Sequence, residues 1–191
     1  WKDYFRFKGT TGFNNRRPYF SLKSDGVLSC GIKNFKVIIV PVLLSINFLP
    51  EGLLYRFLLK FNEMLIRKRI KKVLRKNNIN DFIYINSFNF HYPDVADTLA
   101  PALTVYHCVD PTITPYDKKH GIRSERILVE KSDLVICTSR QLYNEKRILN
   151  PNTFFIPNAA DIHHFSKALK EDLRIHRLLS SVPKPVIGYI G

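Results

Sequence analysis

Polar side chains follow several short apolar segments of the chain, at the point where each segment ends. They can donate or accept protons and hydrogen bonds at a ligand that carries hydroxyl or phosphate groups. In chain order these residues are Asn86, Ser87, His107, Asp110, Ser139, Arg140 and Asn158. We predict that these side chains face a ligand.

The elements that must position these residues alternate between short strands and helices. Strands are predicted at Phe82–Ile85, Leu103–Tyr106, Leu134–Cys137 and Thr153–Ile156. Between the last three, helical patterns span 124–131, with Ser124 as the cap, and 141–149, capped by Ser139. This rhythm predicts an α/β fold, a Rossmann-like parallel sheet flanked by helices, with a ligand crevice at the carboxyl edge of the sheet.

Other segments are less regular. Short strands are predicted at Val27–Cys30 and Lys36–Val40, a short helix from Pro93 toward Leu99, and an irregular loop over 111–121. A long helix is predicted over 51–76, because proline is absent and strong helix formers dominate. Its apolar positions change face, which predicts a kink or two packing partners. The first set is Leu54, Leu58, Phe61 and Leu65, and the second is Ile66, Ile70 and Val73.

The charge is strongly positive. Lys and Arg number 30 against 16 Asp and Glu, a formal net charge of +14, so we expect an anionic partner. Many of these cations lie on helix 51–76, which predicts binding to an anionic membrane surface; the alternative is a solvated helix face. They are Arg56, Lys60, Arg67, Lys68, Arg69, Lys71, Lys72, Arg75 and Lys76.

Several chemistries lack their residues. The three cysteines, Cys30, Cys108 and Cys137, are widely spaced, which is typical of small buried side chains in a reducing compartment. Glycine-rich nucleotide-binding motifs and the GxSxG motif are absent, and His163 and His164 are adjacent rather than four apart. We therefore expect no metal and no bound cofactor. The longest apolar run, over 37–50, is too short to span a membrane. We expect a cytoplasmic protein, peripheral at the inner face of the membrane.

Four segments occur in an order that resembles a known family. They are YHCVD, SERILVEKSDLVICTSRQL, FFIPNAADIHHF and KPVIGYIG, within residues 103–191. The chain resembles the amino-terminal domain of GT-B glycosyltransferases of the retaining family 4 group (group 1). The resemblance implies an acceptor-side domain over 1–182, and the first strand of a donor-binding domain over 183–191. We therefore expect the chain to be a fragment of the enzyme.

The resemblance also implies roles for individual residues. The catalytic ones are His107 and Asp110, and those that bind the acceptor or another substrate are Asn86, Ser87, Ser139, Arg140 and Asn158. His107 stands where many members have a histidine near the acceptor and the transferred sugar, and Asp110 follows within reach of a sugar hydroxyl. Asn158 matches the PNGvD motif, in which Ala159 replaces the glycine. The implied reaction transfers a sugar from a nucleotide-sugar donor to a polysaccharide or lipid-linked acceptor, without a metal. The donor binds mainly to the other domain, so this chain alone is expected to catalyse nothing.

Each candidate also has a purely structural interpretation. His107 would bond backbone in the core, Asp110 before Pro111 would form a turn, Asn158 would shape a loop, and Arg140 would be a solvated helix residue. Two other functions are compatible with the charge. One is a basic nucleic-acid-binding module that uses aromatic residues near the start of the chain, and the other is a non-catalytic interaction module.

Overall fold

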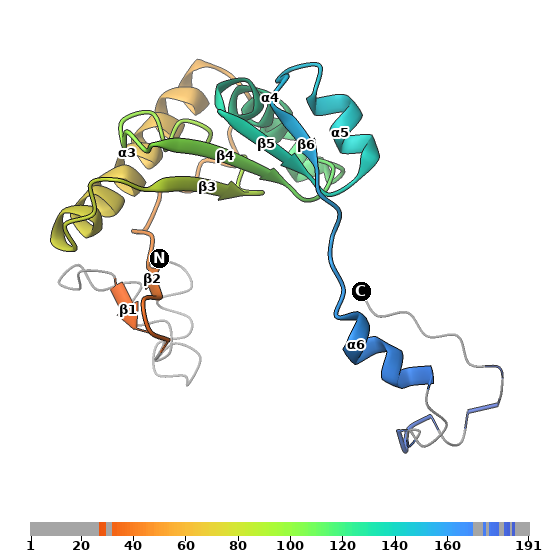
Figure 1. Ribbon diagram of the computed structural model, residues 1–191. Coiled ribbons are helices and arrows are strands. Elements are labelled where there is room, and N and C mark those ends of the chain that lie inside the picture. Colours follow the sequence, from red (N-terminus) through yellow and green to blue (C-terminus); the bar gives the residue numbers. More distant parts are fainter. Residues whose placement is uncertain are drawn as a thin grey trace, which may run out of the picture. The chain divides into compact units, whose positions relative to one another are not determined.

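A parallel sheet of four strands forms the centre of the computed structural model, which describes residues 27–29, 32–169, 174, 176–179, 182–183 and 185. The strands are β3 (Ile83–Ser87), β4 (Leu103–Cys108), β5 (Leu134–Cys137) and β6 (Thr153–Phe155). They lie in the order β3-β4-β5-β6, so each strand pairs with the next along the chain (Figure 1). The predicted α/β fold with a Rossmann-like parallel sheet is confirmed.

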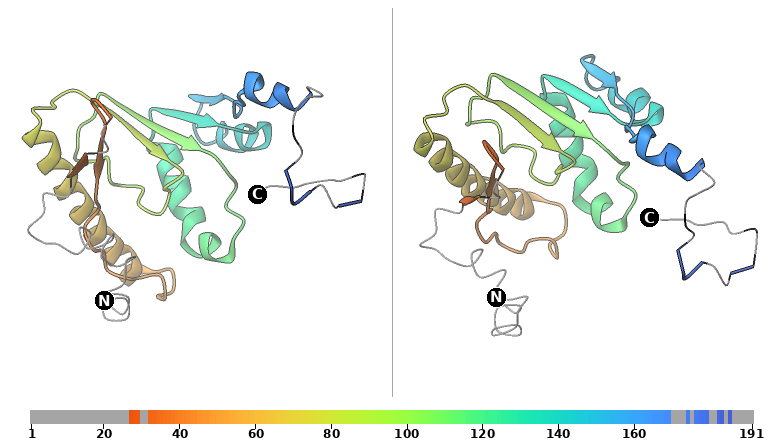
Figure 2. Two further views of the ribbon diagram at one scale, coloured as in Figure 1. Left: turned by 90° about the horizontal axis from the view of Figure 1, so that it is seen from below. Right: turned by 60° about the horizontal axis from the view of Figure 1, so that its bottom comes forward.

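Three helices cover one face of this sheet. They are α3 (Leu53–Lys76), α4 (Pro115–Lys131) and α5 (Arg140–Lys146), and both views of Figure 2 show them on the same side of the strands. The register places Tyr106 beside Val135 and Cys108 beside Cys137 on this covered face. All four side chains are buried, packed against Leu128, Val129 and Leu142. We call this side the covered face.

The other side of the sheet, the open face, carries the alternate residues of the same strands. Ile85 pairs with Val105, and His107 pairs with Ile136, which in turn pairs with Phe154. Ile85 is 62% exposed and Phe154 is 51% exposed, whereas Val105, in a central strand, is buried. None of the helices α3, α4 and α5 lies over this face. The open face is therefore apolar and accessible at its margins.

Helix α3 confirms the predicted long helix and its two packing partners, since Tyr55 and Leu59 pack with Ile46, whereas Ile66 packs with Val95 and Leu99. Its buried residues are Tyr55, Leu59, Asn62, Glu63, Ile66 and Val73, which at 100° per residue fall within about 100° of one another. One continuous face therefore packs, and the predicted change of face is wrong. Leu54 and Phe61 are exposed. The hydropathy pattern gave a wrong prediction because two polar residues, Asn62 and Glu63, occupy the buried face.

Both of those polar residues have hydrogen-bond partners on other segments. The Asn62 side chain accepts a hydrogen bond from the Leu44 backbone N–H at 2.9 Å and donates one to the Leu44 carbonyl at 3.0 Å. One Glu63 oxygen, Oε1, accepts from the Asp94 N–H at 2.8 Å. Hydropathy alone assigns such residues to the solvent side. Their hydrogen bonds offset the free-energy cost of burying the polar groups.

Helix α4 begins earlier than predicted. Thr114 is its cap and accepts a hydrogen bond from the Asp117 N–H, and Pro115 opens the first turn. The predicted irregular loop over 111–121 and the predicted cap at Ser124 are therefore wrong in part, and Ser124 is buried within the helix. Gly121 suggested a loop, but it lies inside the helix because the Phe90 ring packs against it. A Cβ there would lie 2.5 Å from Phe90 Cε2.

The shorter elements agree with prediction in part. Ser139 caps α5, accepting from the Leu142 N–H at 3.2 Å, as predicted. Strands β1 (Val27–Ser29) and β2 (Lys36–Ile38) form an antiparallel pair and confirm both predicted strands in shorter form. The predicted helix from Pro93 consists of turns instead. Within the described residues, no helix is long and apolar enough to cross a membrane.

The chain divides into two compact units, Trp1–Pro157 and Asn158–Gly191. In the second unit, Asp161 caps α6 (Ile162–Phe165) and accepts from the His164 N–H at 2.8 Å, and a 3-10 helix follows over Ser166–Leu169. The strand expected at the end of the chain, over 186–191, and the aromatic residues near its start lie outside the described residues. The expected boundary between 182 and 183 stays a prediction.

Candidate functional site

Ser87 and His107 meet at the carboxyl edge of the sheet. They are register partners on β3 and β4, and Ser87 Oγ lies 3.1 Å from His107 Nδ1, within hydrogen-bond distance. His107 was expected just after a strand ending at Tyr106, but β4 continues to Cys108, so His107 lies within the strand and on the open face. Its Nε2 has no hydrogen-bond partner among the described residues. A ligand at the open face can therefore use that nitrogen.

Phe88 fixes the backbone beside this pair. Its φ of 59° is in the left-handed region, which non-glycine residues seldom adopt and which costs free energy. Its N–H donates to the His107 carbonyl at 3.0 Å, and its ring packs edge-to-face on Phe90 at 5.1 Å between centroids. The strained turn thus ties the end of β3 to His107. The sequence contains no signal for it, because phenylalanine is not a typical left-handed residue.

Asp110 lies in the loop just beyond β4. It is exposed, and no described residue bonds its carboxylate. The loop itself is held to the next strand, because Thr138 Oγ1 donates to the Val109 carbonyl at 2.5 Å and the Thr138 N–H donates to the Cys108 carbonyl at 3.3 Å. Sequence reasoning missed Thr138, although it directly precedes the predicted residues Ser139 and Arg140. The structure therefore places Asp110 at the same edge as His107.

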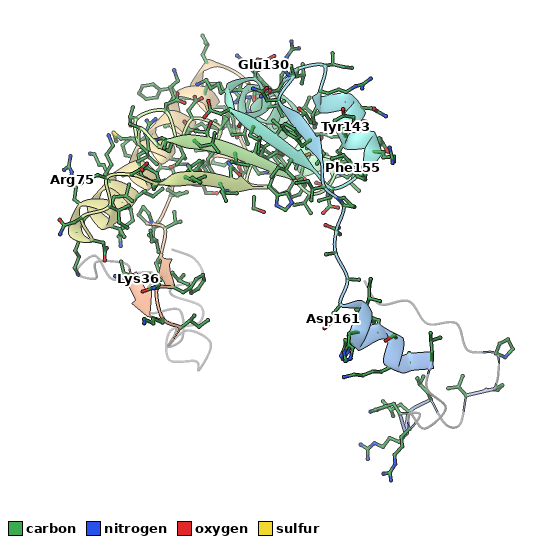
Figure 3. All side chains as sticks on the ribbon, viewed as in Figure 1. Lys36, Arg75, Glu130, Tyr143, Phe155 and Asp161 are labelled. Carbon is green, nitrogen blue, oxygen red and sulfur yellow. The ribbon has the colours of Figure 1, made fainter. Side chains whose placement is uncertain are left out.

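Ser139 and Arg140 follow β5 at that edge. The Ser139 hydroxyl accepts the capping hydrogen bond of α5, which is the structural role predicted for it. Arg140 is exposed, and its Cζ lies 5.1 Å from the centroid of the Phe155 ring on β6. Figure 3 labels Phe155 at the end of its strand. The guanidinium of Arg140 is thus held at the sheet edge and remains available to an anionic or hydroxyl-bearing ligand.

One predicted residue, Asn86, does not join this group. Asn86 is buried on the covered face, where its amide donates to the Asn89 carbonyl at 3.0 Å and its oxygen accepts from the Asn89 N–H at 2.9 Å. It also lines a separate cavity of about 240 Å³ together with Tyr84, Thr104 and Asp133. Asn158 is exposed and belongs to the second compact unit. The structure therefore brings Ser87 and His107 into contact and adds Asp110, Ser139 and Arg140 at the same edge.

A buried polar network lies on the covered face beneath these residues. Glu125 Oε1 accepts from the Tyr106 hydroxyl at 2.8 Å, and Oε2 accepts from Lys146 Nζ at 2.7 Å. Cys108 Sγ lies 3.6 Å from Glu125 Oε1. The side-chain hydrogen bond with Cys137 and burial raise the pKa of the Cys108 thiol, and burial raises the pKa of Tyr106. The network holds the ends of β4 and β5 rigidly against α4 and α5.

The cysteines of this network fulfil their prediction. Cys108 and Cys137 are buried and unbridged, as expected of small core side chains, whereas Cys30 lies outside the described residues. Across the described part of the chain, no three His, Cys, Asp or Glu side chains are grouped as metal ligands. No protein-family model matches the chain, and neither a curated protein nor a solved structure matches it.

Proposed function

We propose that this chain is the acceptor-side domain of a GT-B glycosyltransferase that transfers a sugar from a nucleotide-sugar donor to a saccharide or lipid-linked acceptor. The observation that carries the proposal is the Ser87 and His107 pair, hydrogen-bonded at 3.1 Å at the carboxyl edge of a parallel sheet. Open α/β sheets bind ligands beyond this edge. The resemblance of residues 103–191 to retaining family 4 enzymes supports the same reaction.

In the proposed reaction, this domain orients the acceptor. Ser87 holds the His107 ring at Nδ1, so that Nε2 faces the acceptor hydroxyl or the sugar being transferred. A donor phosphate oxygen takes the proton of the attacking hydroxyl as an oxocarbenium-like transition state forms, and the configuration at the sugar is retained. Asp110 bonds a sugar hydroxyl, and Arg140 stabilises negative charge at the same edge. The donor nucleotide binds mainly to a second domain, and neither a metal nor a bound cofactor takes part.

The test is an assay of the intact protein against a panel of nucleotide sugars, with transfer and donor hydrolysis measured separately. His107→Ala should lower kcat at least about 100-fold, the size of losing one positioned acid–base or hydrogen-bonding group. His107→Asn keeps an acceptor for Ser87 but removes Nε2, and His107→Gln does the reverse. We expect the Gln variant to retain more activity. Absence of both transfer and donor hydrolysis across the panel would count against the proposal.

We also propose that α3 binds an anionic membrane surface from the cytoplasmic side. Large apolar residues near its start are exposed, including Leu53 at 92% and Phe57 at 70%. Its second half carries exposed cations, among them Lys68, Lys72 and Arg75; Arg75 is labelled in Figure 3. Apolar side chains and cations on one exposed surface are the features of an interfacial helix.

Flotation with vesicles tests this membrane contact. The intact protein should float with vesicles that contain anionic lipid and not with neutral ones. The pair Leu53→Ser and Phe57→Ser should reduce flotation severalfold. Ile148→Ser, which changes another exposed apolar residue outside α3, is the matched control and should leave flotation unchanged. Binding that is indifferent to lipid charge would contradict the proposal.

A further inference from the structure

A second groove lies between α3 and α4, on the helix side of the sheet. Its volume is about 370 Å³, within the range of small-molecule sites. Arg56 and Lys60, one turn apart, line it from α3 together with Leu59. Arg123, Ile127 and Lys131 line it from α4 at intervals of four residues. Both views of Figure 2 show these two helices side by side. Two basic ridges therefore face one another across an apolar floor.

The cations of the groove exceed the anions. Arg56, Lys60, Arg123 and Lys131 line it, against one carboxylate, that of Asp94. Lys131 lies between two carboxylates, its Nζ 2.6 Å from Asp94 and 2.9 Å from Asp97, so these three groups together carry one negative charge. Lys60 has no hydrogen bond or ion pair among the described residues. The groove therefore keeps positive charge that its own residues do not neutralise.

Glu51 accounts for part of the remaining charge. Its Oε1 accepts from Arg56 Nε at 2.6 Å and from Arg123 Nη1 at 3.2 Å. Burial opposes its ionisation, but the hydrogen bonds from Arg56 and His120 lower the pKa of Glu51, so it stays charged. One carboxylate shared between two guanidinium groups leaves one positive charge over. Together with Lys60, this makes the mouth of the groove cationic at neutral pH.

Arg56 is held in place like a residue of a preformed anion site. Its Nε donates to Glu51, and its Nη1 donates to Ser124 Oγ at 2.9 Å. Two of the three guanidinium nitrogens are therefore fixed. The third, Nη2, is buried and has no acceptor among the described residues. An unpaired buried donor costs free energy that an entering acceptor recovers. Nothing in the transferase proposal uses this residue, because the proposed reaction lies at the carboxyl edge of the sheet.

We propose that this groove binds a small ligand that carries one or two phosphate groups. Guanidinium groups pair with phosphate through two parallel hydrogen bonds, and lysine adds a mobile point charge, so Arg56, Arg123 and Lys60 together match a phosphate or diphosphate. Leu59 and Ile127 provide an apolar wall for the part of the ligand that bears the phosphate. The phosphate belongs either to a soluble molecule or to a lipid headgroup, and the experiment separates these sources.

The test is calorimetric titration of the intact protein with inorganic pyrophosphate at constant ionic strength. We expect saturable binding that the double variant Lys60→Gln, Arg123→Gln weakens at least tenfold. The matched control is Lys118→Gln, Arg126→Gln, which removes the same charge from α4 outside the groove, and it should change the affinity less than twofold. Circular dichroism and thermal melting verify that both variants are folded.

A parallel titration with phosphatidic acid in phosphatidylcholine vesicles identifies the source. Vesicle binding that the groove variant weakens tenfold and the control does not, without pyrophosphate binding, assigns the site to a lipid headgroup. Pyrophosphate binding with the same pattern assigns it to a soluble phosphate. Equal losses in both variants, or binding by the wild type to neither probe, would overturn the proposal. Neither readout depends on sugar transfer, so this inference stands or fails separately from the transferase.

Discussion

The covered and open faces of the sheet are made by the same four strands, yet they differ in almost every physical respect. On the covered face, Tyr106 and Cys137 are buried beneath helices, and a polar network is satisfied around Glu125. On the open face, Ile85 and Phe154 are exposed and His107 keeps a nitrogen without a partner. Rigid support thus lies on one side of the strands and the available chemistry on the other. Catalytic side chains need such support to hold their geometry.

The largest expected effect breaks the support itself. Lys146→Met leaves the Glu125 carboxylate buried without its ion-pair partner, which typically costs about 3–5 kcal/mol of unfolding free energy. Urea denaturation measures the loss. The double variant Glu125→Leu, Lys146→Met should recover much of it, because no charge is then buried. Equal stability of the single variant and the wild type would mean that the network is not buried in solution.

A second buried carboxyl group, that of Glu63, should make the free energy of unfolding depend on pH. Burial raises the pKa of Glu63 to about 7, while the nearby Asp94 N–H opposes the shift. The native state therefore keeps a proton that the unfolded state loses above about pH 4.5. Stability should fall as pH rises from about 4.5 to 7, and the full penalty should remain above that window.

Glu63→Gln removes this titrating group while keeping an acceptor for the Asp94 N–H. We expect the variant to match the wild type near pH 4.5 and to exceed it by about 2–3 kcal/mol at pH 8. Unfolding midpoints at matched pH values measure the difference between the two proteins, in which contributions common to both cancel. Parallel pH curves would show that Glu63 titrates normally.

The third prediction compares the two faces directly. Val135→Ala removes buried methyl groups from the covered face and should cost about 2 kcal/mol. Ile85→Ala removes more volume but from an exposed position, and should cost less than about 1 kcal/mol. Denaturant unfolding of both variants measures the two losses of unfolding free energy. A loss above about 2 kcal/mol for Ile85→Ala would show that the open face is packed in solution.

The smallest expected effect concerns a single close contact, that between Gly121 and the Phe90 ring. In Gly121→Ala, the new methyl group lies 2.5 Å from Phe90 Cε2, and the displaced ring should cost about 1–3 kcal/mol. The better helix propensity of alanine offsets about 1 kcal/mol of this. A net loss of about 1 kcal/mol in thermal or urea unfolding is therefore expected, and Gly121→Ala with Phe90→Leu should relieve it. Net stabilisation would mean that the ring moves freely.

Local patterns were sufficient for much of the fold. Strand β5 has the predicted ends, Leu134 and Cys137, and α3 ends at Lys76 as predicted. Ser139 caps its helix through its own hydroxyl. These features depend on neighbours within one turn or on alternation along one strand, so side-chain type and spacing alone specify them. The meeting of Ser87 and His107 follows from parallel order, which the alternation of strands and helices also encodes.

Features that depend on distant partners were decided only by the tertiary structure. Asn62 is buried because Leu44 satisfies its amide, Glu63 is buried with one oxygen bonded by the Asp94 N–H, and Gly121 stays helical where Phe90 packs on it. Phe88 takes a left-handed conformation that its sequence neighbours do not demand. Asn86 points to the covered face, one residue from Ser87 on the other. The amino-acid order specified which segments become strands and helices, whereas only long-range packing determined which of their faces is covered, because burial depends on the partner as well as on the residue.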